Sequence, residues 1–264
     1  MRYRSQYGDA VQLPNREALT LWMIRYVQDR DHADGIEVRK ESAWDFHVLG
    51  GILERVRRAA RAYLVLEKRG YGVEGRLVVR SAIEHAVTAQ WAYLTPDGID
   101  RLQVKMMLAR RTYGNTARDK DDPEWVEVMT RIERQIPKNP DGTLKRGMPK
   151  FTGPDGVLET MDNTGYLRRG YSVLSRAGHV TDQAVTDYFA MEDNGTMAIA
   201  DRPAEDHAAP VFHTLAMCCS LSAWVLARLE GDERGIELAS SQGLLHRLDT
   251  HLKPSLRRFP HETK

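Results

Sequence analysis

Apolar side chains recur every three or four positions along most of this chain, a spacing that places them on one face of an α-helix. This pattern constrains the fold more than any motif does, because elements of that kind bury their apolar faces against one another. The ranges predicted to be helical are 14–27, 37–69, 73–94, 99–117, 123–136, 166–178 (with an earlier start near 157), 203–229 and 233–252. We predict an all-α fold, a single multi-helix bundle.

Two segments interrupt the helical pattern. Asn194-Gly195 separates two short apolar runs, and Asn-Gly favours the tight turn of a β-hairpin. We therefore expect a small inserted β-hairpin near 186–200. Segment 137–155 is basic and rich in proline and glycine, which predicts a long loop that is either a lid or a disordered connection.

No internal repeat or Gly/Ser-rich linker divides the chain. We therefore expect residues 1–264 to form a single helical domain, with C-terminal helices over 203–252. The adjacent Cys218 and Cys219 predict small buried side chains in a reducing cytosol rather than a disulfide. We identify no apolar stretch of about 18 residues, the length that a membrane span needs, and so expect a cytoplasmic protein without membrane contact.

Charge gives little guidance about partners. Lys and Arg total 38 and Asp and Glu total 37, so the formal net charge is +1 at pH 7. A chain this close to neutral carries no general argument for a nucleic-acid partner. Local basic clusters at 55–61 and 253–258 have two interpretations, solvated helix faces or a surface that binds a polyanion.

Two apparent motifs carry no chemistry in their context. Residues 70–75 match the letters G-x-G-x-x-G of a dinucleotide-binding loop, but a charged helical segment precedes them where that loop requires a strand. We expect a turn between helices. The histidines lack the spacing of a metal site; His207 and His213, for example, point about 120° apart on a helix. We therefore expect no cofactor and no metal.

The strongest signal lies in the 73–94 helix. Its residues at steps of four and three form a seam that should face other helices. The seam consists of Val73, Leu77, Arg80, Glu84, Val87, Trp91 and Leu94. Arg80 and Glu84 form a pair of opposite charges in its middle. Because buried charges cost several kcal/mol unless they are paired and hydrogen-bonded, further polar partners are expected.

A second helix offers such partners. Tyr171, Ser175 and His179 recur at i,i+4 and place a phenol, a hydroxyl and an imidazole along one face. We expect the two polar rows to meet across a helix pair. The arrangement has two interpretations: a binding or catalytic site, or a structural bridge in which His179 is an ordinary helix-end residue.

These residues also carry a resemblance. Residues 80–85 read Arg-Ser-Ala-Ile-Glu-His and precede an apolar-aromatic run, and residues 171–179 follow the pattern Tyr-x-x-Leu-Ser-x-x-x-His. Over about 40–185 the chain resembles a group of uncharacterised bacterial helical proteins, known only as a domain of unknown function. That group resembles, more distantly, abortive-infection proteins and the HEPN (higher eukaryotes and prokaryotes nucleotide-binding) superfamily.

Many HEPN proteins are metal-independent ribonucleases with an Arg-x4–6-His motif, usually at a dimer interface. The resemblance implies that Arg80 binds the scissile phosphate and that His85 transfers a proton as the 2′-hydroxyl attacks. It also implies a homodimer in bacterial stress or phage defence. The two side chains lie about 140° apart around their helix.

Three classes of function remain open. The first is a HEPN-like ribonuclease with RNA as its partner, acting through Arg80 and His85. The second is a non-catalytic interaction or scaffold module, in which Arg80, Glu84 and His179 fix the helix register. The third is a small-molecule-binding protein or enzyme that uses the cluster formed by Arg80, Glu84, Tyr171, Ser175 and His179.

Overall fold

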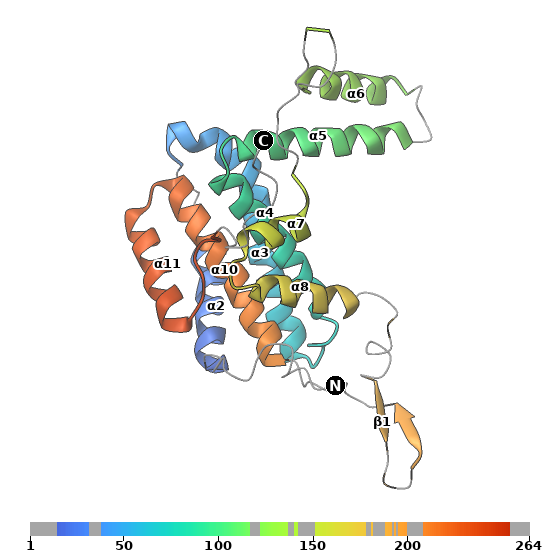
Figure 1. Cartoon of the computed structure of the whole chain (residues 1–264), viewed down its shortest axis with the longest axis vertical. Helices are drawn as coiled ribbons and strands as arrows, with labels where there is room; N and C mark the ends of the chain where they lie inside the picture. The colour runs from blue at the N-terminus through green and yellow to red at the C-terminus, as the bar shows by residue number, and fades with distance from the viewer. Residues whose placement is uncertain are drawn as a thin grey trace, which may run out of the picture. The chain divides into compact units, whose positions relative to one another are not determined.

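Helices dominate the structure, a computed structural model that describes residues 15–31, 38–116, 122–136, 140–141, 151–177, 181, 188–191, 193, 195–199 and 208–253 (Figure 1). The all-α prediction is confirmed for this part of the chain. The elements in chain order are α2 (Arg16–Asp31), the 3-10 turn η1 (Lys40–Ser42), α3 (Ala43–Lys68), α4 (Arg76–Leu94), α5 (Gly98–Thr116), α6 (Pro123–Gln135), α7 (Pro154–Met161), α8 (Tyr166–Ala177), β1 (Phe189–Met191), β2 (Met197–Ile199), α10 (Ala208–Glu230) and α11 (Glu233–His246).

The chain divides into two compact units, one of 1–91 with 153–264 and a smaller one of 92–152. Within the smaller unit α5 contacts α6, and the Trp125 indole Nε1 donates to the Gly114 carbonyl oxygen at 3.3 Å. The expectation of a single domain stays a prediction, because a division of contacts does not measure whether the units unfold together.

Helix α10 is central to the larger unit, since it contacts α2, α3, α8 and α11 (Figure 1). Every residue from 211 to 222, including Cys218 and Cys219, is buried. Residues 209–230 are long and apolar enough to cross a membrane by length and composition, so our expectation that no stretch reaches this length is wrong. Most of this helix is buried among the others, which accounts for its apolar composition.

The turn between α3 and α4 contains the G-x-G-x-x-G letters, and the expected turn between helices is confirmed. Gly70 ends α3 with a φ of 84°, a conformation that glycine adopts readily. A Cβ atom at Gly75 would lie 2.7 Å from the Tyr63 ring. Tyr63 is buried against Phe212 of α10, with ring centroids 5.9 Å apart. Gly75 therefore serves the packing of α3 and α4, and Gly70 serves the turn between them.

Helix α11 ends at His246, so the prediction that it continues to 252 is wrong. Arg247 adopts the left-handed conformation with φ 53°, and the Leu248 N–H donates to the Gly243 carbonyl oxygen at 2.8 Å. This bond and the weaker one from the Arg247 N–H to Leu244 form a Schellman cap. The chain then turns back, and the Lys253 N–H donates to the Met161 carbonyl oxygen at 3.0 Å.

The inserted hairpin is confirmed. Strands β1 and β2 pair antiparallel, with Phe189 opposite Ile199 and Met191 opposite Met197. Gly195 has a φ of 81° in the connection, and Asn194 lies outside the described residues. Most of 137–155 also lies outside them, so both interpretations of that segment stay predictions; its last residues begin α7 at Pro154.

A candidate polar site between helices α4 and α8

Arg80 and Glu84 of α4 meet Tyr171 and Ser175 of α8, as the two polar rows predict. The Arg80 guanidinium lies 3.0 Å from Glu84 Oε1 through Nη2, and its Nε donates to Ser175 Oγ at 3.0 Å. The Tyr171 hydroxyl donates to Glu84 Oε1 at 2.9 Å and lies 3.4 Å from Arg80 Nη2. One guanidinium therefore joins both helices.

The degree of burial differs from the prediction. The side chains of Arg80 and Glu84 are 36% and 31% exposed, and Leu77 of the same seam is 49% exposed. The face of α4 that is buried is centred on Val79, Ile83, Ala86 and Gln90, displaced by one residue from the expected seam. The expectation of a buried ion pair is therefore wrong, and the pair lies at the margin of the helix interface.

Partial exposure limits what this pair contributes to stability. Solvent screens a half-exposed ion pair, and such pairs typically stabilise a fold by about 1 kcal/mol or less. An apolar pair at the same margin would bury more surface without a cost for desolvating charge. Stability alone therefore gives a weak reason for placing these four polar side chains together, and this favours a functional interpretation.

Tyr171 acts in this cluster as a neutral donor. Burial, followed by the hydrogen bond to Glu84, raises the pKa of Tyr171 above its usual value. The Arg80 guanidinium carbon also lies 5.4 Å from the centre of the Tyr171 ring, which holds the cation over an aromatic face. Tyr171 can therefore orient Arg80 and Glu84, whereas its protonated phenol cannot serve as a base near neutral pH.

The cluster keeps hydrogen-bonding capacity for a ligand. Among the described residues, Arg80 Nη1 and Glu84 Oε2 have no hydrogen-bond partner. Ser175 accepts from Arg80, so its hydroxyl proton is available for donation. His179, the third residue of the α8 row, lies outside the described residues, and its role stays a prediction.

His85 is separate from this cluster. Its Nδ1 lies 2.6 Å from the Ser81 carbonyl oxygen and 3.4 Å from the Ser81 hydroxyl. Because a carbonyl oxygen only accepts, Nδ1 carries a proton, and in the neutral tautomer of this kind Nε2 is the acceptor. Within the described part of the chain, no hydrogen bond, ion pair or ring contact joins His85 to Arg80, Tyr171 or Ser175.

Two buried polar groups escaped the sequence analysis. Gln90, with no exposed surface, donates to the carbonyl oxygens of Leu221 and Thr250 and accepts the Leu252 N–H. His213, which is 4% exposed, packs edge-on against Tyr166, whose hydroxyl lies 2.9 Å from its Nδ1. The spacing of His213 was tested only against that of metal ligands. Gln90 lies on a face of α4 that was not predicted to be buried.

The surroundings of His213 hold it neutral. Burial lowers the pKa of His213 to about 4, although the backbone of Arg247 opposes the shift slightly. In the described structure Nε2 has no hydrogen-bond partner.

The described residues contain no group of three or more His, Cys, Asp or Glu side chains placed to hold a metal ion.

Comparison of the chain with protein-family models, curated proteins and solved structures finds no match.

Proposed function

We propose that this chain is a HEPN-like, metal-independent ribonuclease of bacterial stress or phage defence, in which Arg80 and His85 act on RNA. The observation that carries the proposal is the fixed state of His85, whose Nδ1 proton is held by the Ser81 carbonyl oxygen at 2.6 Å. A histidine held in this tautomer presents the unprotonated Nε2 as a general base. The motif resemblance supports the same residue pair.

The proposed chemistry needs no cofactor. Nε2 of His85 takes the proton of a ribose 2′-hydroxyl, the 2′-oxygen attacks the adjacent phosphorus, and the bond from phosphorus to the 5′-oxygen breaks. The products are a 2′,3′-cyclic phosphate and a 5′-hydroxyl, which receives its proton from the imidazolium or from water. Arg80, held by Ser175 and Tyr171, stabilises the negative charge that develops on the phosphate oxygens.

The positions of the two side chains on α4 favour a site shared between two chains. His85 is five positions after Arg80, which places the two side chains about 140° apart around the helix and roughly 7.5 Å apart along it. Two side chains so placed do not reach one phosphate easily from a single helix. A symmetric homodimer would bring Arg80 of one chain and His85 of the other to one phosphate.

Mixing inactive variants tests this arrangement. Purified Arg80→Ala and His85→Ala are each expected to lose RNA cleavage in EDTA. Refolding an equal mixture should restore about a quarter of the wild-type rate, because half of the dimers then contain one intact site out of two. Cleavage that survives His85→Ala would end the proposal, and a mixture without activity would place both residues in one chain. Thr88→Ala, a change of a half-buried side chain on the same helix, is the control for altered folding.

Glu84 supplies a second test, because its carboxylate neutralises the guanidinium that is proposed to bind phosphate. Glu84→Gln keeps the shape of the side chain and removes the competing charge. We expect this variant to bind an uncleavable 2′-O-methyl RNA more tightly than the wild type and Arg80→Ala to bind it more weakly. Equal affinities in all three proteins would contradict a phosphate role for Arg80.

The second candidate is a non-catalytic interaction or scaffold module, favoured by the mutual pairing of Arg80, Glu84, Tyr171 and Ser175. In that case these residues fix the register of α4 against α8. Arg80→Ala would then change only the stability of the protein, and every RNA assay would be negative for the wild type as well.

A further inference from the structure

The outer face of α3 carries a strip of aromatic and basic side chains that the proposed site does not use. Because a helix turns about 100° per residue, Trp44, His47, Arg55, Arg58 and Arg69 fall within about 80° of one another around the axis. All five are exposed. We call these five residues the α3 outer face.

Positive charge is concentrated on this helix although the whole chain has a net charge of only +1. Arg55 and Arg69 take part in no ion pair or side-chain hydrogen bond among the described residues, and the exposed Lys68 lies beside the strip. Glu54 pairs with Arg57 at 2.7 Å and with Arg58 at 3.0 Å, so it offsets part of this charge. The cluster is therefore a local feature of α3 and does not follow from a generally basic chain.

The aromatic side chain at the N-terminal end of the face, Trp44, is unusual because it is large and lies outside the core. Trp44 is 48% exposed and stacks on His47, with ring centroids 5.9 Å apart and planes inclined by 22°. Tyr71, just beyond the other end of α3, is 55% exposed. A large aromatic ring exposed at the surface offers a plane on which an unpaired base can stack.

Basic side chains that recur along a groove or helix, combined with exposed aromatic rings, are what single-stranded nucleic acids require of a protein. Gly51 and Ala62 lie on the same strip and leave room for a strand to approach the helix. From Trp44 to Arg69 the helix extends roughly 38 Å, enough for several nucleotides. A membrane surface fits less well, because apart from Trp44 and Val65 this face lacks apolar side chains that could insert among lipids.

We propose that the α3 outer face binds single-stranded RNA, with bases stacked at Trp44 and phosphates bound by Arg55, Arg58 and Arg69. The choice of RNA over DNA rests on the proposed ribonuclease function, whereas the stacking and phosphate contacts rest on α3 alone. We propose single-stranded rather than duplex RNA because a base that is paired and stacked within a duplex has no free face on which the Trp44 ring can stack.

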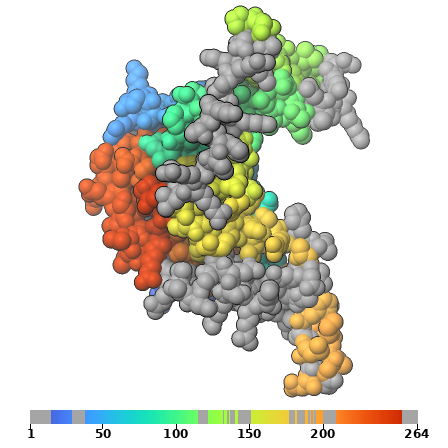
Figure 2. Space-filling view, in the orientation of Figure 1, coloured from blue at the N-terminus to red at the C-terminus, as the bar shows by residue number. Residues whose placement is uncertain are grey.

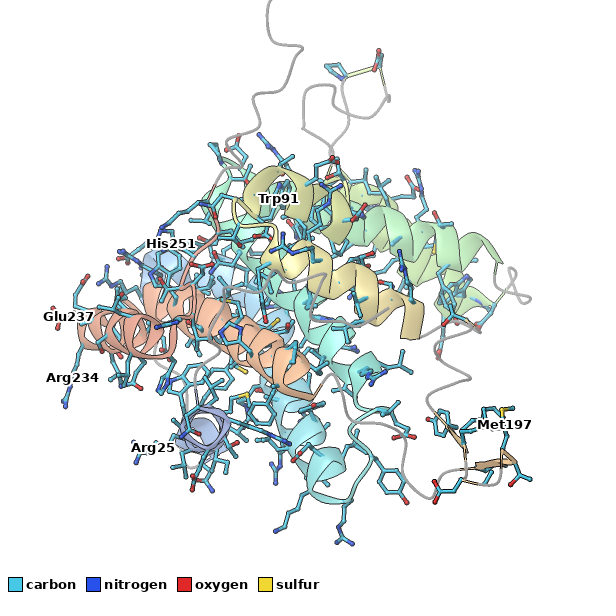
Figure 3. All side chains as sticks on the ribbon, turned by 60° about the horizontal axis from the view of Figure 1, so that its bottom comes forward. Arg25, Trp91, Met197, Arg234, Glu237 and His251 are labelled. Carbon is cyan, nitrogen blue, oxygen red and sulfur yellow. The ribbon has the colours of Figure 1, made fainter. Side chains whose placement is uncertain are left out.

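Two variants with equal charge changes test the proposal. Arg55→Gln/Arg69→Gln removes two cations from the face and leaves the pairing of Arg58 with Glu54 intact. Arg25→Gln/Arg234→Gln removes two cations elsewhere; both arginines are exposed and point outward from α2 and α11 (Figure 3). Trp44→Ala tests stacking, and circular dichroism with thermal unfolding shows whether each variant keeps the fold.

Binding is measured by fluorescence anisotropy in EDTA with an unstructured 2′-O-methyl RNA of about 12 nucleotides, a length within the usual range for single-strand sites. A plot of log affinity against log salt concentration has a negative slope. In the Arg55/Arg69 variant this slope should become shallower by about 1.4, because each phosphate contact to a single strand contributes about 0.7 to its magnitude. Trp44→Ala should weaken binding about tenfold, and the Arg25/Arg234 variant should bind like the wild type. Equal losses in both double variants, or no loss in either, would overturn the proposal.

Binding measurements with other ligands show whether single-stranded RNA is the one that the face prefers. Tighter binding of duplex RNA than of single strands, tighter binding of the same DNA sequence, or Arg55/Arg69-dependent binding confined to phosphatidylserine vesicles would each contradict the proposal. The readout is also independent of catalysis. Binding through α3 without any cleavage would defeat the ribonuclease proposal alone, and cleavage with unaltered binding by the α3 variants would defeat this inference alone.

Discussion

The Arg80 guanidinium lies over the Tyr171 ring at 5.4 Å, and the hydroxyl of the same tyrosine donates to Glu84. One aromatic side chain thus holds both members of an ion pair. Tyr171→Phe keeps the ring and removes the donor, so we expect the free energy of unfolding to fall by about 1 kcal/mol. Urea denaturation measures this change, with the exposed Tyr71→Phe as a control expected to have no effect. A loss above about 3 kcal/mol would indicate a buried network and contradict the half-exposed geometry.

Gln90 should be far less tolerant of substitution. Gln90→Leu removes the partners of the Leu252 N–H and of two carbonyl oxygens, and the bonds to Leu252 and Leu221 are buried. We expect the free energy of unfolding to fall by roughly 2–4 kcal/mol, because each buried group left without a partner costs about 1–3 kcal/mol. Gln28→Leu, at an exposed position of α2, should change it by less than about 0.5 kcal/mol.

Two of the three glycines in the turn between α3 and α4 should respond differently to the same added methyl group. A Cβ at Gly75 would lie 2.7 Å from the Tyr63 ring, whereas a Cβ at Gly72 would find its nearest neighbour, Glu67 Cγ, at 3.9 Å. We expect Gly75→Ala to destabilise the protein by about 1–3 kcal/mol through overpacking and Gly72→Ala to leave it unchanged or slightly more stable. Equal melting temperatures for the two variants would contradict this account of the turn.

Protonation of His213 should destabilise the protein in mild acid. Burial lowers its folded-state pKa to about 4 from the usual 6.5, so the unfolded chain takes up the proton first as the pH falls. The free energy of unfolding is not reduced by this effect above pH 6.5. Between pH 6.5 and about 4 the effect lowers it progressively, by roughly 3 kcal/mol at most. Urea denaturation at pH 7.5, 6 and 5 should therefore show a smaller decline for His213→Phe than for the wild type. His47→Gln, on the exposed face of α3, should decline as the wild type does. A parallel decline in all three proteins would show that His213 does not govern this pH range.

The sequence predicts the helices well where one apolar face repeats without interruption, as on α3 and throughout α10. It also predicts that Arg80 and Glu84 meet the α8 row, because polar residues at i,i+4 on two helices can satisfy one another. It misplaces the buried face of α4 by one residue. Ala82, Ala86 and Ala89 are buried there, and alanine weighs little in an apolar pattern, so the larger Leu77 and Trp91 determined the expected seam.

Other features depend on tertiary contacts that no local pattern contains. The end of α11 requires Arg247 to adopt a left-handed conformation, which non-glycine residues rarely do, and it is stabilised by the cap and by the chain that follows. Leu244 and Leu245, near the end of α11, are both largely exposed, and α11 lies at the molecular surface (Figure 2). His213 lies in an apolar run, and only its contact with Tyr166 sets it apart from its neighbours.

The hydrogen bonds of the Gln90 side chain to Leu221, Thr250 and Leu252 also affect the order in which the bundle forms. Gln90 and Leu252 are 162 positions apart, so the last bonds around the α4 core cannot form until residue 252 has left the ribosome. Closing so long a loop is entropically costly and slows folding relative to contacts between sequence neighbours. During synthesis, the apolar surface of α10 therefore lacks the contacts that Asp249 makes with Met217 and that His251 makes with Trp224 until the end of this segment is available.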